Sequence, residues 1–298
     1  MQSTAELVLD ARCGVGESPL WSVAEQALYW VDIPAGRLHR WDAQSGLSRH
    51  WQAPEMLACL ARRGDGPGFV GGMESGLFTL TTPEAAALEC HRLAEVAHAA
   101  PGMRFNDGRC DRQGRFWAGT MVMDMAARRA AGALYRFDAR GLQPMLQGLL
   151  VPNGLGFSPD GRTLYLSDSH PASQAIWAFD YDPDDGVPQR QRLWVDMKTL
   201  PGRPDGAAVD EDGGYWICAN DAGMVHRFTP QGRLDRSLPL PVAKPAMCAF
   251  GGAQLDTLYV TTIRPADLAP HEQPLAGAVF ALRPGVRGLP EPAFAGPS

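Results

Sequence analysis

The segment TLYLSD (163–168) decides the fold, because five other segments repeat its pattern of aromatic residues leading into small or polar ones. These are ALYWVD (27–32), PGFVGG (67–72), RFWAGT (115–120), GYWICA (214–219) and TLYVTT (257–262). The central aromatic residues follow one another at intervals of 40, 48, 48, 51 and 43, and we call them anchors: Tyr29, Phe69, Trp117, Tyr165, Trp216 and Tyr259. Repeats of this length are typical of β-propeller blades.

A second strand-like segment follows each anchor: GRLHRWD (36–42), GLFTLT (76–81), GALYRFD (132–138), AIWAFDYD (175–182), GMVHRFT (223–229) and GAVFALR (277–283). Two strands joined by a short polar turn form a hairpin. Helical candidates occur only at 84–99 and 122–131, too few for a helical solenoid or a parallel α/β sheet. We therefore expect an all-β fold, one six-bladed propeller over residues 1–298 with four antiparallel strands per blade. Residues 5–10 (AELVLD) should complete the last blade, so removing them should open the ring.

Composition limits the partners. The chain has 298 residues, and 45% of them are hydrophobic, which is enough for a sizeable core. Its net charge of −6 argues against binding to nucleic acid or to anionic membranes. A small-molecule partner is expected instead. The six cysteines contain no C-x-x-C pair, which predicts buried free thiols. Without a signal-peptide pattern or a membrane-spanning run, we expect a cytoplasmic monomer or small homo-oligomer.

Polar residues recur at one phase of the repeat. Counting back 11 or 12 residues from the anchors of four blades gives Glu17, Asn106, Asn153 and Asp205. The same count in the other two blades gives Leu57 or Ala58, and Met247 or Cys248. Residues at one phase of a propeller lie at one radius, so these four should line the central channel. The alternative is that Asn-Gly and Asp-Gly here are ordinary turn dipeptides.

Two carboxylates and a carboxamide that converge in a channel need a cation or a proton between them. The oxygen donors of Glu17, Asn153 and Asp205 suit hard divalent ions such as Ca²⁺, Mg²⁺ or Mn²⁺, and also Fe²⁺. They lack the His and Cys side chains that usually hold zinc. We expect one divalent metal ion, Ca²⁺ first, with Zn²⁺, Fe²⁺, Mn²⁺ or Mg²⁺ as alternatives.

Five motifs carry a resemblance over nearly the whole chain: GESPLW (16–21), RFNDGRCDRQGRFWAGTM (104–121), PNGLGFSPDGRTLYLSDS (152–169), PDGAAVDEDGGYW (204–216) and CAFGGAQLDTLYVTT (248–262). The sequence resembles the senescence-marker protein, gluconolactonase and luciferin-regenerating enzyme family. The resemblance implies a six-bladed propeller whose channel metal is held by Glu17, Asn153 and Asp205. It implies substrate binding by Arg104 and Asn106, and a further acidic contact from Asp124, one methylene shorter than the Glu often found there.

The activity that this resemblance implies is hydrolysis of a sugar lactone to the aldonic acid. The expected substrates are gluconolactone or a pentonolactone such as xylono- or arabinonolactone, with Asp205 as the catalytic base. The sequence has no G-x-S-x-G motif to support an acyl-enzyme. Two alternatives remain: a non-catalytic calcium-binding or scaffold propeller, and a quinone-dependent sugar dehydrogenase. The dehydrogenase would need basic and His residues at the channel mouth, where only Arg104 is evident.

Weaker signals have structural interpretations beside the functional ones. The acidic run DYDPDDG (180–186) partly matches an EF-hand loop, but we interpret it as a solvated hairpin turn. Asp32 and Asp168 end matching strands, where they could line the pocket or accept hydrogen bonds at the strand ends. His39 and His226 share a strand phase, which favours a packing role.

Overall fold

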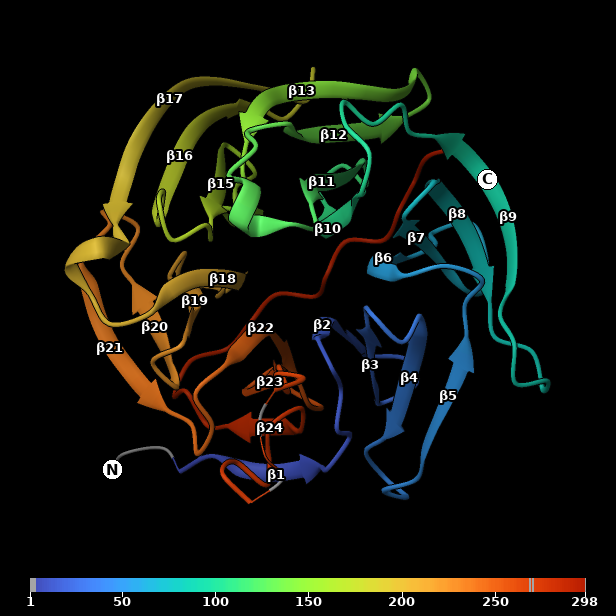
Figure 1. The fold of residues 1–298 in the computed structure, drawn as a ribbon, viewed down its shortest axis with the longest axis vertical. Helices are drawn as coiled ribbons and strands as arrows, with labels where there is room; N and C mark the ends of the chain where they lie inside the picture. The colour runs from blue at the N-terminus through green and yellow to red at the C-terminus, as the bar shows by residue number, and fades with distance from the viewer. Residues whose placement is uncertain (1–3, 268, 270, 298) are drawn as a thin grey trace.

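The computed structural model describes residues 4–267, 269 and 271–297 and confirms the all-β propeller. Six four-stranded antiparallel sheets surround a central channel (Figure 1). Blade 1 contains β2 (Gly16–Ser22), β3 (Ala27–Asp32), β4 (Arg37–Asp42) and β5 (Ser48–Gln52). Blade 2 contains β6 (Leu57–Arg62), β7 (Phe69–Met73), β8 (Gly76–Thr81) and β9 (Glu89–Glu95). Blade 3 contains β10 (Met103–Cys110), β11 (Phe116–Val122), β12 (Gly132–Asp138) and β13 (Gly141–Leu149).

Blades 4 and 5 continue in the same order, from the channel outward. Blade 4 contains β14 (Pro152–Phe157), β15 (Thr163–Asp168), β16 (Ala175–Asp182) and β17 (Val187–Asp196). Blade 5 contains β18 (Arg203–Val209), β19 (Tyr215–Asn220), β20 (Met224–Phe228) and β21 (Leu234–Pro239). Blade 6 draws on both ends of the chain, with β22 (Pro245–Gly251), β23 (Thr257–Thr262), β24 (Val279–Leu282) and β1 (Glu6–Leu9). In this blade β1 pairs antiparallel with β24, and Leu7 lies opposite Phe280.

Hydrophobic burial explains which strands lie inside. All residues of β2, β3, β11 and β14 are buried, whereas the outer strand β17 is mostly exposed. The anchors Trp117 and Trp216 are fully buried, which confirms that they are core residues. All six cysteines are free and five are buried, as predicted. Among the described residues, no helix has the length and apolar character needed to cross a membrane.

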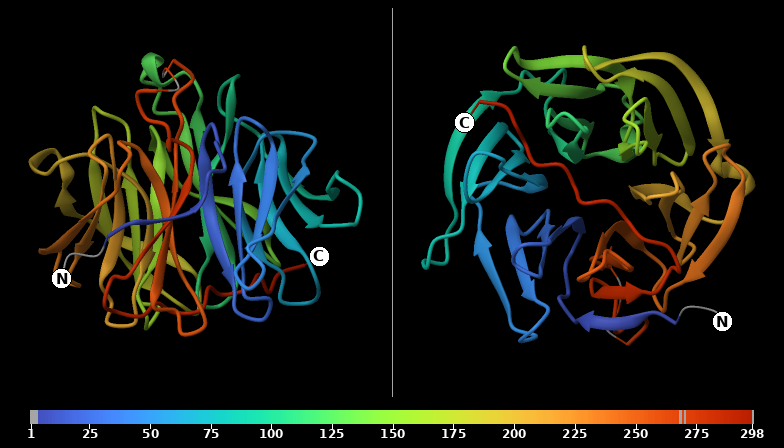
Figure 2. Two further views of the ribbon diagram at one scale, coloured as in Figure 1. Left: turned by 90° about the horizontal axis from the view of Figure 1, so that it is seen from below. Right: turned by 180° about the vertical axis from the view of Figure 1, so that it is seen from behind.

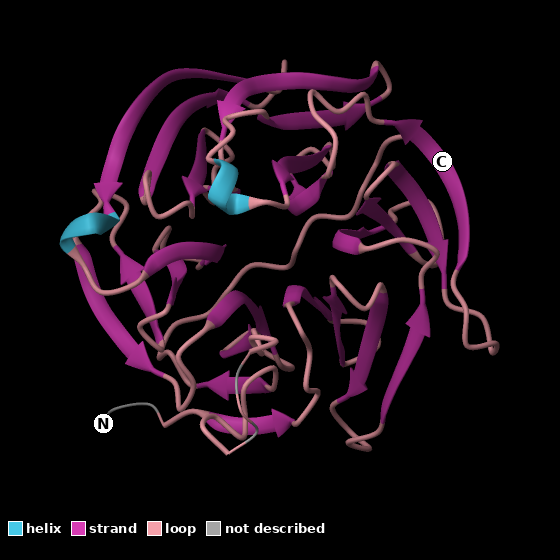
Figure 3. Cartoon of the chain, in the orientation of Figure 1, coloured by secondary structure: helices cyan, strands magenta, loops and turns pink. Residues whose placement is uncertain are grey.

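The helical candidate at 84–99 is wrong. Residues 89–95 form β9, the outer strand of blade 2, which pairs with β8 from Glu95 opposite Gly76 to Glu89 opposite Thr81. Hydrogen bonding to an existing sheet outweighs a weak local helical preference. The candidate at 122–131 contains one 3₁₀ turn, η1 (Met125–Ala127), and η2 (Met197–Thr199) is another (Figure 3).

A C-terminal segment, residues 284–297, crosses the end of the channel at which the inner strands finish. Gly288 bridges to Asp210 just after β18, and Phe294 bridges to Arg63 just after β6. Between them, Glu291 lies 3.7 Å from the guanidinium of Arg109 in β10. In the side view of Figure 2 this red segment follows one rim, and the green η1 region lies at the other. We call it the C-terminal strap. The channel residues at the starts of the inner strands therefore face the rim opposite the strap.

Candidate functional site

The four channel residues share a feature of local structure. Each inner strand that carries one has a register shift there: between Glu17 and Leu20 in β2, Phe105 and Gly108 in β10, Asn153 and Gly156 in β14, and Pro204 and Ala207 in β18. A bulge breaks the regular alternation of side chains and turns a residue out of the sheet. The bulges therefore turn these polar side chains toward the channel.

Asn153 and Asp205 are in direct contact. The Asn153 amide Nδ2 donates to Asp205 Oδ1 at 2.7 Å and to Ser169 Oγ at 2.6 Å. The other oxygen of Asp205 accepts a 2.6 Å bond from Asn220 Nδ2. Burial raises the pKa of Asp205 to about 7, although the bond from Asn220 and the charge of Arg203 oppose the rise. A carboxyl group with this pKa can exchange a proton near neutral pH.

Glu17 belongs to the same cluster electrostatically. It is buried, and this burial, together with the charges of Asp205 and Asp107, holds the pKa of its carboxyl well above the usual range. Its Oε2 has no hydrogen-bond partner among the described residues. Burying several carboxyl groups together is unfavourable unless a proton or a cation neutralises them.

Arg104 and Asn106 form one unit beside this cluster. Arg104 Nη1 donates to Asn106 Oδ1 and to the Phe105 carbonyl, both at 2.8 Å. Asn106 Nδ2 donates to the Pro152 carbonyl at 3.1 Å, which links blade 3 to the residue before Asn153. The positive charge of Arg104 opposes, without reversing, the rise in the pKa of Glu17, so this charge reaches the acidic cluster.

Asp124 differs from the other candidates. It is exposed and begins η1, where its carboxylate accepts a hydrogen bond from the Ala126 backbone at 3.1 Å. The contacts of the described residues do not connect it with the other five candidates. The η1 turn lies at the rim near the centre of the ring in Figure 1, and His170 of blade 4 contacts its Met125 carbonyl at 3.1 Å.

The sequence prediction missed Asn220, Ser169 and Asp107. Asn220 and Ser169 bind Asp205 and Asn153, and each lies four residues after the anchor of its blade, so the repeat contained a signal for them. Asp107 is buried beside Asn106, and its Oδ2 accepts from the Leu155 backbone at 2.9 Å. The count from the anchors selects its neighbour Asn106 and therefore gives no signal for Asp107.

The oxygen atoms present fit a divalent cation. Asn153 Oδ1 and Glu17 Oε2 are buried without hydrogen-bond partners among the described residues, and the Asp205 carboxylate adjoins Asn153. Unpartnered buried oxygens are costly in the absence of a ligand. The set contains one amide and two carboxylates and no sulfur or nitrogen donor, which suits a hard ion such as Ca²⁺.

Close packing at the site explains the glycine that follows Asn153. Gly154 has φ +58°, and a Cβ atom there would lie 2.5 Å from the Tyr215 hydroxyl and 2.7 Å from Ser167 Oγ. The same hydroxyl donates to the Gly154 carbonyl at 2.5 Å. A side chain at this position would push blade 5 away and disturb the contact between Asn153 and Asp205.

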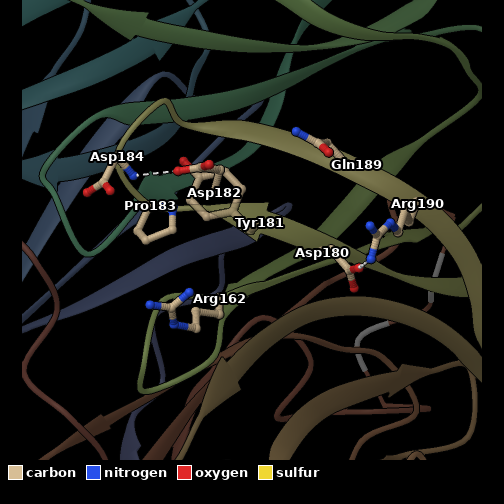
Figure 4. Close-up of a pocket in the computed structure, with 8 residues that line it drawn as sticks. All are labelled: Arg162, Asp180, Tyr181, Asp182, Pro183, Asp184, Gln189 and Arg190. Atoms are coloured by element: carbon tan, nitrogen blue, oxygen red, sulfur yellow. Dashed lines mark hydrogen bonds and ion pairs between the residues drawn. The ribbon is translucent and has the colours of Figure 1, made fainter.

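A hollow lies away from the channel, on the outer part of blade 4 (Figure 4). It has a volume of about 600 Å³, and the acidic run 180–186 forms one side of it. Asp182 accepts hydrogen bonds from the backbones of Asp184 and Asp185 at 2.9 and 3.2 Å, and Arg115 donates to the carbonyls of Pro183 and Asp184. The predicted hairpin turn is confirmed, since the local donors already engage its oxygens.

The strand-end aspartates accept backbone hydrogen bonds. Asp168 Oδ2 accepts from Leu150, and its Oδ1 accepts from Val151 and His170, at 2.9 to 3.1 Å. Asp32 Oδ1 accepts from Val15 at 3.1 Å. Of the two interpretations left open by the sequence, the structure favours hydrogen bonding at the strand ends.

Comparison with known proteins adds three curated relatives. The sequence pattern of the SMP-30/Gluconolactonase/LRE-like region matches residues 15–264. A 6-deoxy-6-sulfogluconolactonase of Pseudomonas putida is 42% identical over 99% of this chain and 100% of its own length. Regucalcin of Sus scrofa is 34% identical over 98% of each chain. Pentonolactonase XacC of Haloferax volcanii is 32% identical over 87% of this chain and 85% of its own.

Two solved structures share the fold. A luciferin-regenerating enzyme superposes with a TM-score of 0.91 at 26% identity, covering 98% of this chain and 99% of that one. A regucalcin from Agrobacterium tumefaciens, described as a calcium-binding protein, gives 0.89 at 26% identity, covering 99% and 97%. Both matches extend over the whole propeller.

Proposed function

The chain belongs to the SMP-30/gluconolactonase/LRE-like family, and we propose that it hydrolyses a sugar lactone to the aldonic acid with the help of a divalent metal ion. The strongest support is the convergence of Glu17, Asn153 and Asp205. Glu17 Oε2 and Asn153 Oδ1 have no hydrogen-bond partner among the described residues, and the pKa of the Asp205 carboxyl is raised to about 7. Similarity to two lactonases, over 99% and 87% of this chain, points to the same chemistry.

Glu17, Asn153 and Asp205 would hold the ion, and Ca²⁺ is the first choice because all three offer oxygen. A bound divalent ion polarises a carbonyl group and offsets the negative charge that develops on its oxygen.

Asp205 acts as the general base. It takes a proton from a water molecule as the water oxygen attacks the lactone carbonyl carbon. The ring C–O bond then breaks, and the ring oxygen takes up a proton to become a hydroxyl group of the aldonic acid. Asn220 and Asn153 hold the two carboxylate oxygens of Asp205, so the base is oriented before substrate arrives.

Arg104 and Asn106 bind and orient the substrate. One guanidinium nitrogen of Arg104 is fixed by Asn106, which leaves its other N–H groups for the ester or hydroxyl oxygens of the sugar. Asp124, on η1 at the open rim, accepts a hydrogen bond from a sugar hydroxyl. We place gluconolactone and the pentonolactones, xylono- and arabinonolactone, as the substrates.

A non-catalytic calcium-binding propeller is the second candidate, since the regucalcin structure is described as a calcium-binding protein. The two functions differ in turnover. Acid release should be followed in a pH-stat for gluconolactone, xylonolactone, arabinonolactone and 6-deoxy-6-sulfogluconolactone, with the spontaneous rate subtracted. We expect at least one lactone to be hydrolysed, the activity to disappear with a chelator, and Ca²⁺ to restore it. A metal-loaded protein without turnover on the whole panel would favour the non-catalytic function.

A further inference from the structure

A second group of metal-ligating side chains lies outside the channel, where the ring closes. Cys13 is in the segment between β1 and β2, Asp32 ends β3, and His39 lies in the middle of β4. One ligand atom from each, the cysteine sulfur, a carboxylate oxygen and an imidazole nitrogen, lies within 4.8 Å of the others. In a tetrahedral zinc site such atoms are about 3.6 Å apart, so a shift of about 1 Å would bring them into range.

The contacts of these side chains leave ligand capacity unused. Cys13 is buried, and its sulfur accepts a 3.4 Å hydrogen bond from Trp30 Nε1. The His39 ring stacks on Trp30, with centroids 5.0 Å apart and planes 10° apart, which fixes its orientation. His39 Nε2 is inaccessible to solvent and has no hydrogen-bond partner among the described residues. An orphaned buried nitrogen is costly, and a metal ion would satisfy it.

The equivalent residues of blades 4 and 5 have hydrogen-bond partners that the blade 1 residues lack. His226 occupies the matching place in β20, and there Nδ1 contacts Ser237 Oγ at 2.7 Å and Nε2 contacts the Pro201 carbonyl at 3.0 Å. Asp168 matches Asp32, and both of its oxygens accept backbone bonds. Only blade 1 joins an unpartnered histidine nitrogen to a neighbouring thiol among these matched sites.

We infer that Cys13, Asp32 and His39 hold a zinc ion that fastens the closure of the propeller. Sulfur, nitrogen and carboxylate oxygen are donors that Zn²⁺ accepts together, with a water molecule as the fourth ligand. The donor set differs in kind from the all-oxygen set of the channel. The two sites should therefore select different metals.

The protonation states agree with this assignment. Burial lowers the pKa of His39 to about 4, so its ring is neutral at pH 7, as a metal ligand must be. Burial and the charge of Asp32 raise the pKa of the Cys13 thiol to about 12.

The position of Cys13 gives the ion a structural purpose. The Cys13 N–H donates to the Gly277 carbonyl just before β24 at 2.9 Å, and its carbonyl accepts from Arg264 N–H at 3.2 Å. Cys13 also packs in an apolar cluster that contains Trp30 of blade 1 and Val279 of blade 6. An ion joining Cys13 to Asp32 and His39 would tie the segment between the last blade and the first to two strands of blade 1.

Cobalt can report on this site because a thiolate bound to Co²⁺ absorbs in the near ultraviolet, whereas an all-oxygen site does not. Chelator-treated protein should be titrated with Co²⁺ alone as the probe. We expect the thiolate band in the wild type and in Asp205→Asn, and its loss in Cys13→Ser. Cys90→Ser, which removes a partly buried thiol from another blade, is the matched control and should keep the band.

Stability gives a second measurement. Zn²⁺ should raise the unfolding temperature of chelator-treated Asp205→Asn, and adding Cys13→Ser to this variant should abolish the rise. Should Cys13→Ser fail to fold, His39→Gln takes its place, since this half-buried side chain should weaken Co²⁺ binding at least about tenfold. A wild type without the thiolate band, or a band that survives in Cys13→Ser, would overturn the inference.

Discussion

Glu17 and Asp205 show at the level of single residues why we propose a cation at the channel cluster. Both are buried, and both have pKa values raised by loss of solvent. Each carboxylate would be more stable in water, so folding without a cation concentrates unfavourable charge at one place. Active sites commonly sacrifice stability in this way, because the arrangement that favours a ligand is unfavourable without it.

Replacing Glu17 with Gln should stabilise the metal-free protein at pH 8, on the order of 1–2 kcal/mol, because the neutral Gln avoids the cost of burying a carboxyl group whose pKa is raised in the folded state. The raised pKa of Glu17 means that its stability contribution is fully present below its unfolded pKa, near 4.5, and is lost as the pH rises through the folded value. The difference between variant and wild type should therefore vanish near pH 4. Urea unfolding in the presence of a chelator, at pH 8 and at pH 4, measures the difference in stability at each pH.

The matched control for this variant is Glu211→Gln, which removes an exposed carboxylate and should leave stability unchanged. Addition of Ca²⁺ should stabilise the wild type and have little effect on Glu17→Gln. A variant that is less stable than the wild type at pH 8 with chelator would show that the Glu17 charge is well satisfied without a cation.

Asn220→Ala should move the acidic limb of the activity profile to higher pH. The Asn220 side chain donates to Asp205 Oδ2 and thereby lowers the pKa of this carboxyl, so its loss raises that pKa. We expect kcat at pH 7 to fall about tenfold or more, with recovery as the pH rises. Ser169→Ala is the control, since Ser169 binds Asn153 rather than Asp205. An unmoved limb in Asn220→Ala would separate Asp205 from proton transfer.

Single site residues could be predicted from the sequence where they occupy the same position in several repeats. Glu17, Asn153 and Asp205 could be found because a polar residue recurs at a fixed distance before the anchors. Asn220 lies at a second phase of the repeat, four residues after its anchor Trp216, and the count back from the anchors does not reach it. The contacts of Asp124 could not be predicted, because they depend on the path of an exposed turn between blades.

At the level of elements, strand positions could be predicted and strand irregularities could not. The predicted segments at 27–32, 76–81 and 175–182 coincide with β3, β8 and β16. The bulges at the starts of the inner strands depend on how two strands align, which residue types alone do not fix. The polar outer strand β9 lay within a helical candidate because it lacks the apolar pattern of the inner strands.

The last blade combines an N-terminal strand, β1, with three C-terminal strands, because β1 pairs with β24. Deleting residues 1–10 should expose the edge of β24, lower the unfolding temperature by about 5 °C or more and promote association. Thermal unfolding and size-exclusion chromatography measure these effects. Leu7→Ser, which alters a half-exposed side chain but keeps the strand, should behave as the wild type. A deletion variant of unchanged stability would contradict the proposal that β1 closes the ring.

On the scale of the whole molecule, the two rims of the propeller have different roles. The C-terminal strap crosses one rim, where Arg109 meets Glu291 and Phe294 stacks on Phe137 at 5.6 Å. The opposite rim carries η1 and the starts of the inner strands, where the acidic cluster lies. Radial repetition explains this division, because each blade presents equivalent ends to the same side of the ring.

The most direct test of a metal-dependent lactonase centred on Asp205 is the initial rate of lactone hydrolysis by Asp205→Asn, measured with saturating Ca²⁺ on the best substrate of the panel. The isosteric control is Asp212→Asn, which alters an exposed turn. We predict that Asp205→Asn loses about 10²- to 10⁴-fold in kcat while Asp212→Asn matches the wild type. Full activity in Asp205→Asn would contradict the account.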